Sequence, residues 1–121
     1  MKNLYDLRVA QVIDSYDIVI NAGYEDEISQ NMTFLLYSLE EEVLDPETGE
    51  SLGQLEKVKG TVSVKHIQQK LSIATSNEIN TIRVPKSGLN ALAMMSSDTE
   101  ERRVKAKLRD PAVGDRVRRI S

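Results

Sequence analysis

Residues 32–55 read MTFLLYSLEEEVLDPETGESLGQL, and this stretch predicts a long β-hairpin. The apolar run over residues 32–39 is typical of a central strand, and residues 40–44 can extend that strand beyond a core into solvent. Residues 45–50 form a turn sequence, because proline presets φ, aspartate accepts backbone N–H bonds and glycine adopts the left-handed conformation. The chain then pairs back on itself. We therefore expect a protruding hairpin near residues 40–55, whose tip is acidic and lacks apolar side chains.

Outward from this hairpin, hydrophobicity alternates with a period of two, which is typical of β-strands. Residues 7–13 and 16–20 are predicted to pair around a turn at Asp14 and Ser15. Ile67 breaks the parity of the strand before it, which indicates a bulge or a twist. Further strands are expected at residues 71–75, 81–84, 103–109 and 116–120. Short strands separated by turns favour an all-β fold, a small antiparallel β-barrel of SH3-like or OB-like type, in one domain over residues 1–121.

One segment departs from this alternation. Residues 86–98 lack β-branched side chains and are rich in leucine, alanine and methionine. That composition suits either a short helix or a long loop near residues 86–100, and both alternatives stay open. Met-rich apolar segments adapt to protein partners, although such a segment can equally cover an open end of the barrel.

The composition excludes several kinds of site. There is no cysteine, so disulfides, thiolate nucleophiles and cysteine-ligated metals are ruled out. Aromatic residues make up only 4% of the chain, and the core must therefore be aliphatic. No stretch approaches the roughly 20 apolar residues of a membrane span, and no apolar segment of a signal peptide is present. We expect a cytoplasmic protein with no membrane partner.

The net charge of -3 conceals a strong asymmetry between the two halves of the chain. Residues 1–56 hold 13 acidic and 2 basic residues, whereas residues 57–121 hold 14 basic and 6 acidic residues. If the halves interleave in one sheet system, their charges neutralise across strands, which is the interpretation we favour. If acidic and basic faces instead lie apart, they can join copies of the chain head to tail.

Catalytic motifs are missing from the sequence. His66 is the only histidine, and its place in an alternating strand favours a half-buried structural side chain over a general base. No nucleophile elbow, dinucleotide-binding glycine pattern or phosphate loop occurs. Asp45, Glu47 and Glu56 approach calcium-loop spacing, but Glu50 stands where that loop requires glycine. We predict that the chain is not an enzyme and holds no cofactor or metal.

Four stretches resemble a family of small bacterial β-barrel domains related to the C-terminal domain of flagellar assembly protein T. They are IVINAG at residues 18–23, FLLY at 34–37, DPETGESLG at 45–53 and VGDRV at 113–117. The family typically has a second glycine and an aspartate where this chain has Asn31 and Met32. The resemblance implies a non-catalytic barrel used in assembly, from a bacterium or a phage. Turn motifs specify shape more than activity, so a flagellar role does not follow.

These observations predict a protein–protein interaction or assembly module, with self-association as one form of it. The expected partner-binding residues are Asp45, Glu47, Glu50, Leu89, Leu92, Met94 and Met95. The alternative is a nucleic-acid-binding barrel that uses basic residues near the C-terminus, which could also contact an acidic partner. These residues are Arg103, Lys105, Lys107, Arg109 and Arg118. The aromatic residues all lie in the acidic half, so stacking platforms beside the basic residues are missing and nucleic acid is the weaker candidate.

Overall fold

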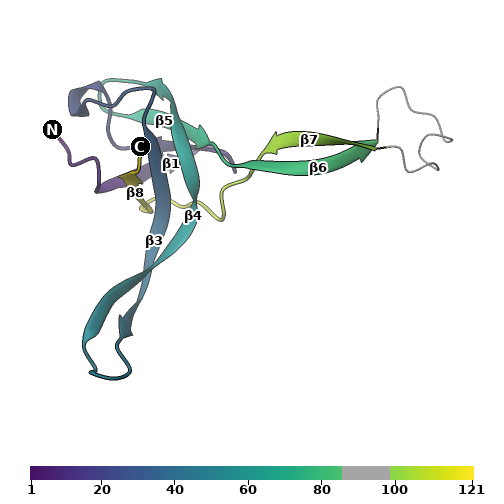
Figure 1. Cartoon of the computed structure of the whole chain (residues 1–121). Coiled ribbons are helices and arrows are strands. Elements are labelled where there is room, and N and C mark those ends of the chain that lie inside the picture. The colour runs from purple at the N-terminus through teal and green to yellow at the C-terminus, as the bar shows by residue number, and fades with distance from the viewer. Residues whose placement is uncertain (86–98) are drawn as a thin grey trace.

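Six strands of the computed structural model close into an antiparallel barrel, in the order β1-β2-β5-β4-β3-β8 (Figure 1). The structure describes residues 1–85 and 99–121. The barrel strands are β1 Leu7–Val12, β2 Asp17–Ile20, β3 Thr33–Leu44, β4 Ser51–Ile67, β5 Ser72–Ser76 and β8 Arg116–Arg119. A short 3-10 helix, η1 Tyr24–Asp26, follows β2, and the strands β6 Ile79–Pro85 and β7 Thr99–Lys105 form a separate two-stranded sheet. The predicted all-β fold, a small antiparallel barrel, is confirmed.

The first hairpin forms where the alternation predicts it. The Asp14 carboxylate accepts hydrogen bonds from the backbone N–H groups of Tyr16 and Asp17, both at 2.8 Å, and thereby shapes the turn between β1 and β2. The predicted irregularity before Ile67 is also confirmed, because the β4–β5 register shifts between Val64 and His66. That bulge leaves the His66 side chain exposed, so the expectation that it is half-buried is wrong.

The barrel interior is aliphatic apart from Phe34, as the composition predicts. Inward-facing side chains from all six strands meet in one core. The largest fully buried side chains are Phe34, Leu7, Ile18, Ile20, Leu36, Val9, Val62 and Val117.

The two oppositely charged halves of the chain interleave around the barrel. Ion pairs join Lys65 to Asp17 at 3.1 Å and Arg116 to Asp6 at 3.2 Å, and each pair combines an acid from the first half with a base from the second. These contacts confirm the predicted neutralisation for the barrel wall.

The C-terminal part differs from the expected strand over residues 103–109. Strand β7 ends at Lys105, and it pairs with β6 outside the barrel rather than with a barrel strand. Ala106 and Leu108 are buried in the connection to β8, where the Leu108 N–H donates to the carbonyl of Ser15. The strand ends four residues earlier than expected because these two apolar side chains leave the hairpin to pack against the barrel. At the other end of β7, Thr99 and Glu100 are in the strand, so a loop or helix does not extend to residue 100.

A buried ion pair ties this connection to β4. The Lys59 ammonium donates to a carboxylate oxygen of Asp115 at 2.8 Å and to the carbonyl of Asp110 at 2.9 Å. Both side chains of the pair are only 8% exposed, and the same Asp115 oxygen accepts the N–H of Ala112. The neighbouring Gly60 has a φ of +147°, and a Cβ atom there would lie 2.7 Å from the Leu108 side chain. The connection therefore packs against a position that only glycine fits.

We predict that Lys59→Met lowers the free energy of unfolding by about 3 kcal/mol, because it leaves the Asp115 carboxylate buried without its partner. Urea unfolding measures this loss. Lys57→Met, an exposed position on the same strand, is the matched control and should change stability by less than about 0.5 kcal/mol. Equal effects of the two substitutions would contradict a role for the buried pair.

Candidate interaction surface

Strands β3 and β4 continue beyond the barrel as a two-stranded projection, which we call the acidic arm and define as residues 38–58 (Figure 1). Strand β8 pairs with β3 only over residues 34–37, and β5 pairs with β4 only over residues 62–67. Past these positions the two strands pair only with each other among the described residues. Residues 41–58 are all exposed except the half-buried Asp45. The protruding hairpin predicted near residues 40–55 is thus confirmed.

The tip of the arm has the predicted turn chemistry. The Asp45 carboxylate accepts the backbone N–H of Glu47 at 2.8 Å, and the Asp45 carbonyl accepts the N–H of Gly49 at 2.8 Å. Gly49 has a φ of +76°, the left-handed conformation expected of it. Asp45 therefore shapes the turn, whereas the side chains of Glu47 and Glu50 are exposed to solvent.

The stem of the arm exposes aliphatic side chains that the core does not use. Five of them are between 37% and 64% exposed, and they are Val43, Leu44, Leu52, Leu55 and Val58. Full burial of one such side chain contributes about 1.5–3 kcal/mol, so a partner that covered the stem would gain substantial affinity. Sequence reasoning placed the contact at the acidic tip and missed the stem, although these residues flank the turn in the sequence.

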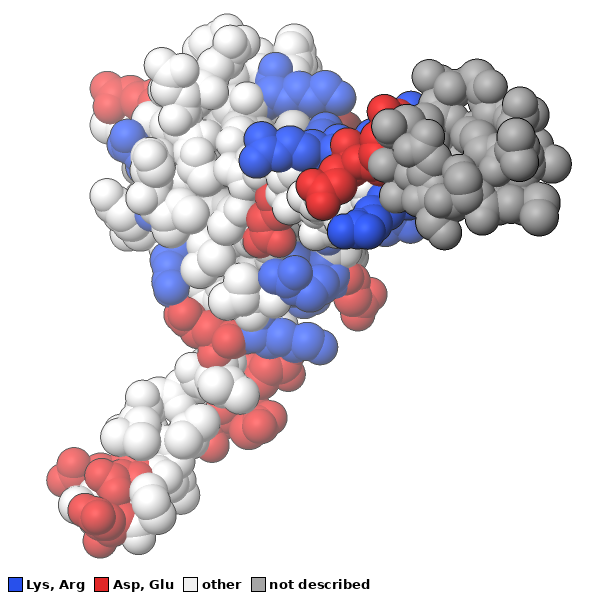
Figure 2. Space-filling view, turned by 45° about the vertical axis from the view of Figure 1, so that its right-hand side comes forward, with Lys and Arg blue, Asp and Glu red and all other residues white. Residues whose placement is uncertain are grey.

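The arm is also strongly acidic. Residues 38–58 contain seven acidic residues and a single basic one, Lys57. Figure 2 shows the acidic side chains at the tip and near the root of the arm, with an uncharged stretch between them. An uncharged, partly aliphatic stem bordered by charge is the arrangement expected of a surface that excludes water on binding and selects its partner by charge.

The open edges of the arm are poorly suited to adding another strand. The β3–β4 register shifts between Leu39 and Glu42 and again between Val43 and Leu44. Bulges of this kind increase the twist of a strand pair, and charged side chains along an edge disfavour further pairing. A partner is therefore expected to dock against the side chains of the arm rather than to extend its sheet.

Arg118 anchors the root of the arm to the barrel. Its guanidinium lies 4.8 Å from the centroid of the Tyr37 ring and donates a hydrogen bond to the Glu56 carboxylate at 2.7 Å. The hydrogen bond to Glu56 raises the pKa of Arg118 above its ordinary value. This side chain, one of the candidate nucleic-acid contacts, is thus held by β3 and β4.

The other candidate basic residues do not form one strand face. Arg103 and Lys105 lie on β7, whereas Lys107 and Arg109 lie in the connection that leaves the hairpin. The Lys105 ammonium donates to the Thr75 hydroxyl at 2.8 Å, and Arg109 pairs with Glu78 at 3.6 Å. In Figure 2 acidic side chains interrupt the basic ones on this side of the molecule. The structure therefore divides the predicted basic stripe between the separate sheet, its connection and the barrel.

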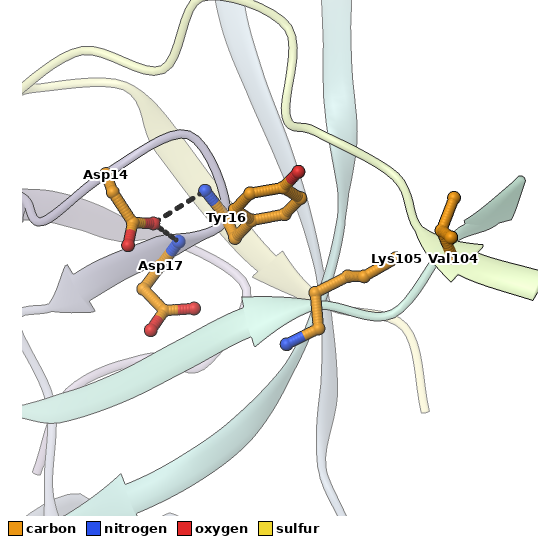
Figure 3. A pocket seen from close by; sticks show the side chains of 5 residues that line it. All are labelled: Asp14, Tyr16, Asp17, Val104 and Lys105. Carbon is orange, nitrogen blue, oxygen red and sulfur yellow. Dashed lines mark hydrogen bonds between the residues drawn. The ribbon is translucent and has the colours of Figure 1, made fainter.

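An open pocket of about 360 Å³ lies where the β6–β7 hairpin meets the β1–β2 turn (Figure 3). It is lined by Asp14, Tyr16, Asp17, Val104 and Lys105. The Asp14 carboxylate is occupied by the two backbone N–H groups of the turn. Burial alone would raise the pKa of Asp17, but hydrogen bonds from Thr75 and Lys65 lower it overall, so this carboxylate is charged at neutral pH. The charged groups of the pocket are thus already partnered.

Four of the expected partner-binding residues lie outside the part of the chain that the structure describes: Leu89, Leu92, Met94 and Met95. Within residues 1–85 and 99–121, no group of three or more histidine, aspartate and glutamate side chains is arranged to hold a metal ion. No helix in these same ranges is long and apolar enough to cross a membrane.

Comparison with known proteins assigns no family to the chain. No protein-family model matches the sequence, and no curated protein matches it. The function must therefore be argued from the surface of this molecule, where the acidic arm is the most distinctive feature.

We predict that Arg118→Ala loosens the root of the arm and lowers stability by about 1 kcal/mol, because it removes an exposed ion pair and a contact with an aromatic ring. Hydrogen–deuterium exchange should become faster for the backbone amides of the acidic arm. Arg119→Ala is the matched control on the same strand, since among the described residues the Arg119 side chain donates only to the carbonyl of Ser121. Unchanged exchange in Arg118→Ala, or an equal increase in the control, would contradict this role.

Proposed function

We propose that the chain is a non-catalytic assembly module that binds a protein partner through the acidic arm. The observation that carries the proposal is the set of five exposed aliphatic side chains on the arm. A monomeric barrel gains nothing from projecting these side chains into water, whereas a partner that covers them gains the free energy of their burial.

The construction of the arm supports the same proposal. An isolated two-stranded hairpin is marginally stable at best, but here both strands continue into the barrel wall. The contact between Arg118 and Glu56 holds the root in place. Part of the conformational entropy of the arm is therefore lost on folding, and less has to be lost on binding. A pre-organised projection of this kind suits recognition by another protein.

The resemblance to assembly-related barrel domains agrees with this function and favours a bacterial or phage origin. The absence of cysteine is consistent with a cytoplasmic location. Nucleic-acid binding is the weaker alternative, because the projecting arm is acidic and repels phosphate.

The test is a variant in which Asn-Gly replaces residues 40–55. It keeps the Leu39–Glu56 pair as the last pair of a short hairpin and retains the contact of Glu56 with Arg118. We expect a circular-dichroism spectrum and a urea midpoint close to those of the full chain, because the residues removed make no part of the core. Affinity capture from the native host should retain a partner with the full chain and lose it with the shortened one.

A pair of point variants sharpens this test. Leu52→Ser should weaken partner binding at least about tenfold, which corresponds to roughly 1.4 kcal/mol. Val113→Ser is the matched control, because Val113 is 68% exposed and Leu52 is 64% exposed, but Val113 lies in the connection before β8 and is not part of the arm. Retention of the same partners by the shortened chain would show that the arm is not the binding surface.

A further inference from the structure

We infer that the partner of the acidic arm is a second copy of this chain, which receives the arm on one face of its β6–β7 hairpin. This inference rests on the proposed function and identifies the partner. It is based on the charge of the receiving face and its exposed Ile79 side chain, and on the directions in which the two projections leave the barrel.

One face of the β6–β7 hairpin is basic. The register pairs Ile79 with Lys105, Thr81 with Arg103 and Arg83 with Glu101, without any shift along the hairpin. Because side chains alternate between faces with a period of two, these residues share one face. It has three cations against a single carboxylate, and since the Lys105 ammonium is bonded to Thr75, Arg83 and Arg103 are the cations that a partner would meet. Ile79 on the same face is 57% exposed, so an apolar contact is available there as well.

The opposite face of this hairpin has no such charge. It presents Ile82, Val84 and Val104, together with Arg102 and Glu100, which pair with each other at 3.4 Å. The excess positive charge of the hairpin is therefore confined to the face that includes Arg83 and Arg103. A partner with seven acidic residues and exposed aliphatic side chains complements that face in both respects.

The two projections cannot neutralise each other within one molecule. The acidic arm and the β6–β7 hairpin leave the barrel in different directions in both views (Figures 1 and 2). Among the described residues, no ion pair joins the arm to this hairpin, and the arm's one ion pair to the rest of the chain is Glu56 with Arg118 on β8. Contact between these complementary surfaces therefore requires two copies.

The contact is head to tail, because the donated arm and the receiving face are different surfaces of the same chain. Such heterologous contacts repeat from copy to copy and either close into a ring or continue as a filament. Burial of Leu44, Leu52 and Leu55 supplies affinity, and the opposite charges set the orientation. The association should weaken as salt rises, since both charged surfaces are exposed to solvent.

The experiment is sedimentation velocity on the purified full chain over a range of concentrations, at low and high salt. The wild type should form oligomers in a concentration-dependent manner and dissociate at high salt. Glu42→Lys with Glu50→Lys makes the arm much less acidic, and Arg83→Glu with Arg103→Glu makes the receiving face acidic. Each double variant alone should associate at least about tenfold more weakly than the wild type.

The decisive sample is an equal mixture of the two double variants, because the unaltered arm of the face variant can then bind the unaltered face of the arm variant. We expect association to return in this mixture. Glu25→Lys with Glu27→Lys changes the net charge as much as the arm variant does, at exposed positions away from both surfaces, and should associate like the wild type.

A wild type that stays monomeric at every concentration, or a mixture that fails to recover association, would overturn the inference. If the purified chain is monomeric but the host capture retains a different protein through the arm, the proposed function stands and only the second copy is excluded. If arm-dependent capture fails too, both the proposed function and the second copy as partner are excluded. Retention of nucleic acid in place of a protein would also exclude the second copy.

Discussion

The buried ion pair between Lys59 and Asp115 is the interaction on which the rest of the structure depends. Lys59 is the first buried residue of β4 after the exposed acidic arm, and Gly60 beside it admits the Leu108 side chain. Together they hold the connection between β7 and β8 against the barrel. That connection delivers β8 to its place between β1 and β3, where it closes the barrel and removes two open sheet edges.

Closure of the barrel determines what the two hairpins can do. Because β8 and β5 cover only the barrel portions of β3 and β4, the rest of these long strands projects as an arm with a fixed root. The same connection ends β7 at Lys105 and leaves the β6–β7 sheet outside the barrel. A barrel with two projections of complementary charge is the physical basis of the assembly proposed above.

Charge is distributed in two ways in this molecule. In the barrel wall the acidic and basic halves of the chain alternate, and pairs such as Lys65 with Asp17 neutralise each other. On the projections the charges stay separated, because each hairpin is built from segments of similar composition and, within residues 1–85 and 99–121, has no third strand beside it. The barrel is thus internally balanced, whereas the hairpins present charge that a second molecule can satisfy.

The sequence by itself determined the local elements. Strict alternation specified barrel strands, Asp14 and the residues from Asp45 to Gly49 specified turns, and Ile67 marked a bulge, because these features depend on near neighbours and on the period of a strand. It also indicated the projecting hairpin, and with it Glu47 and Glu50 as exposed acids. Only the tertiary structure decided that Leu52 and Leu55 stay uncovered, that Arg118 faces Glu56, and that Arg103 and Arg118 belong to different sheets. These facts depend on which distant strands become neighbours, and hydrophobic periodicity has no information about that choice.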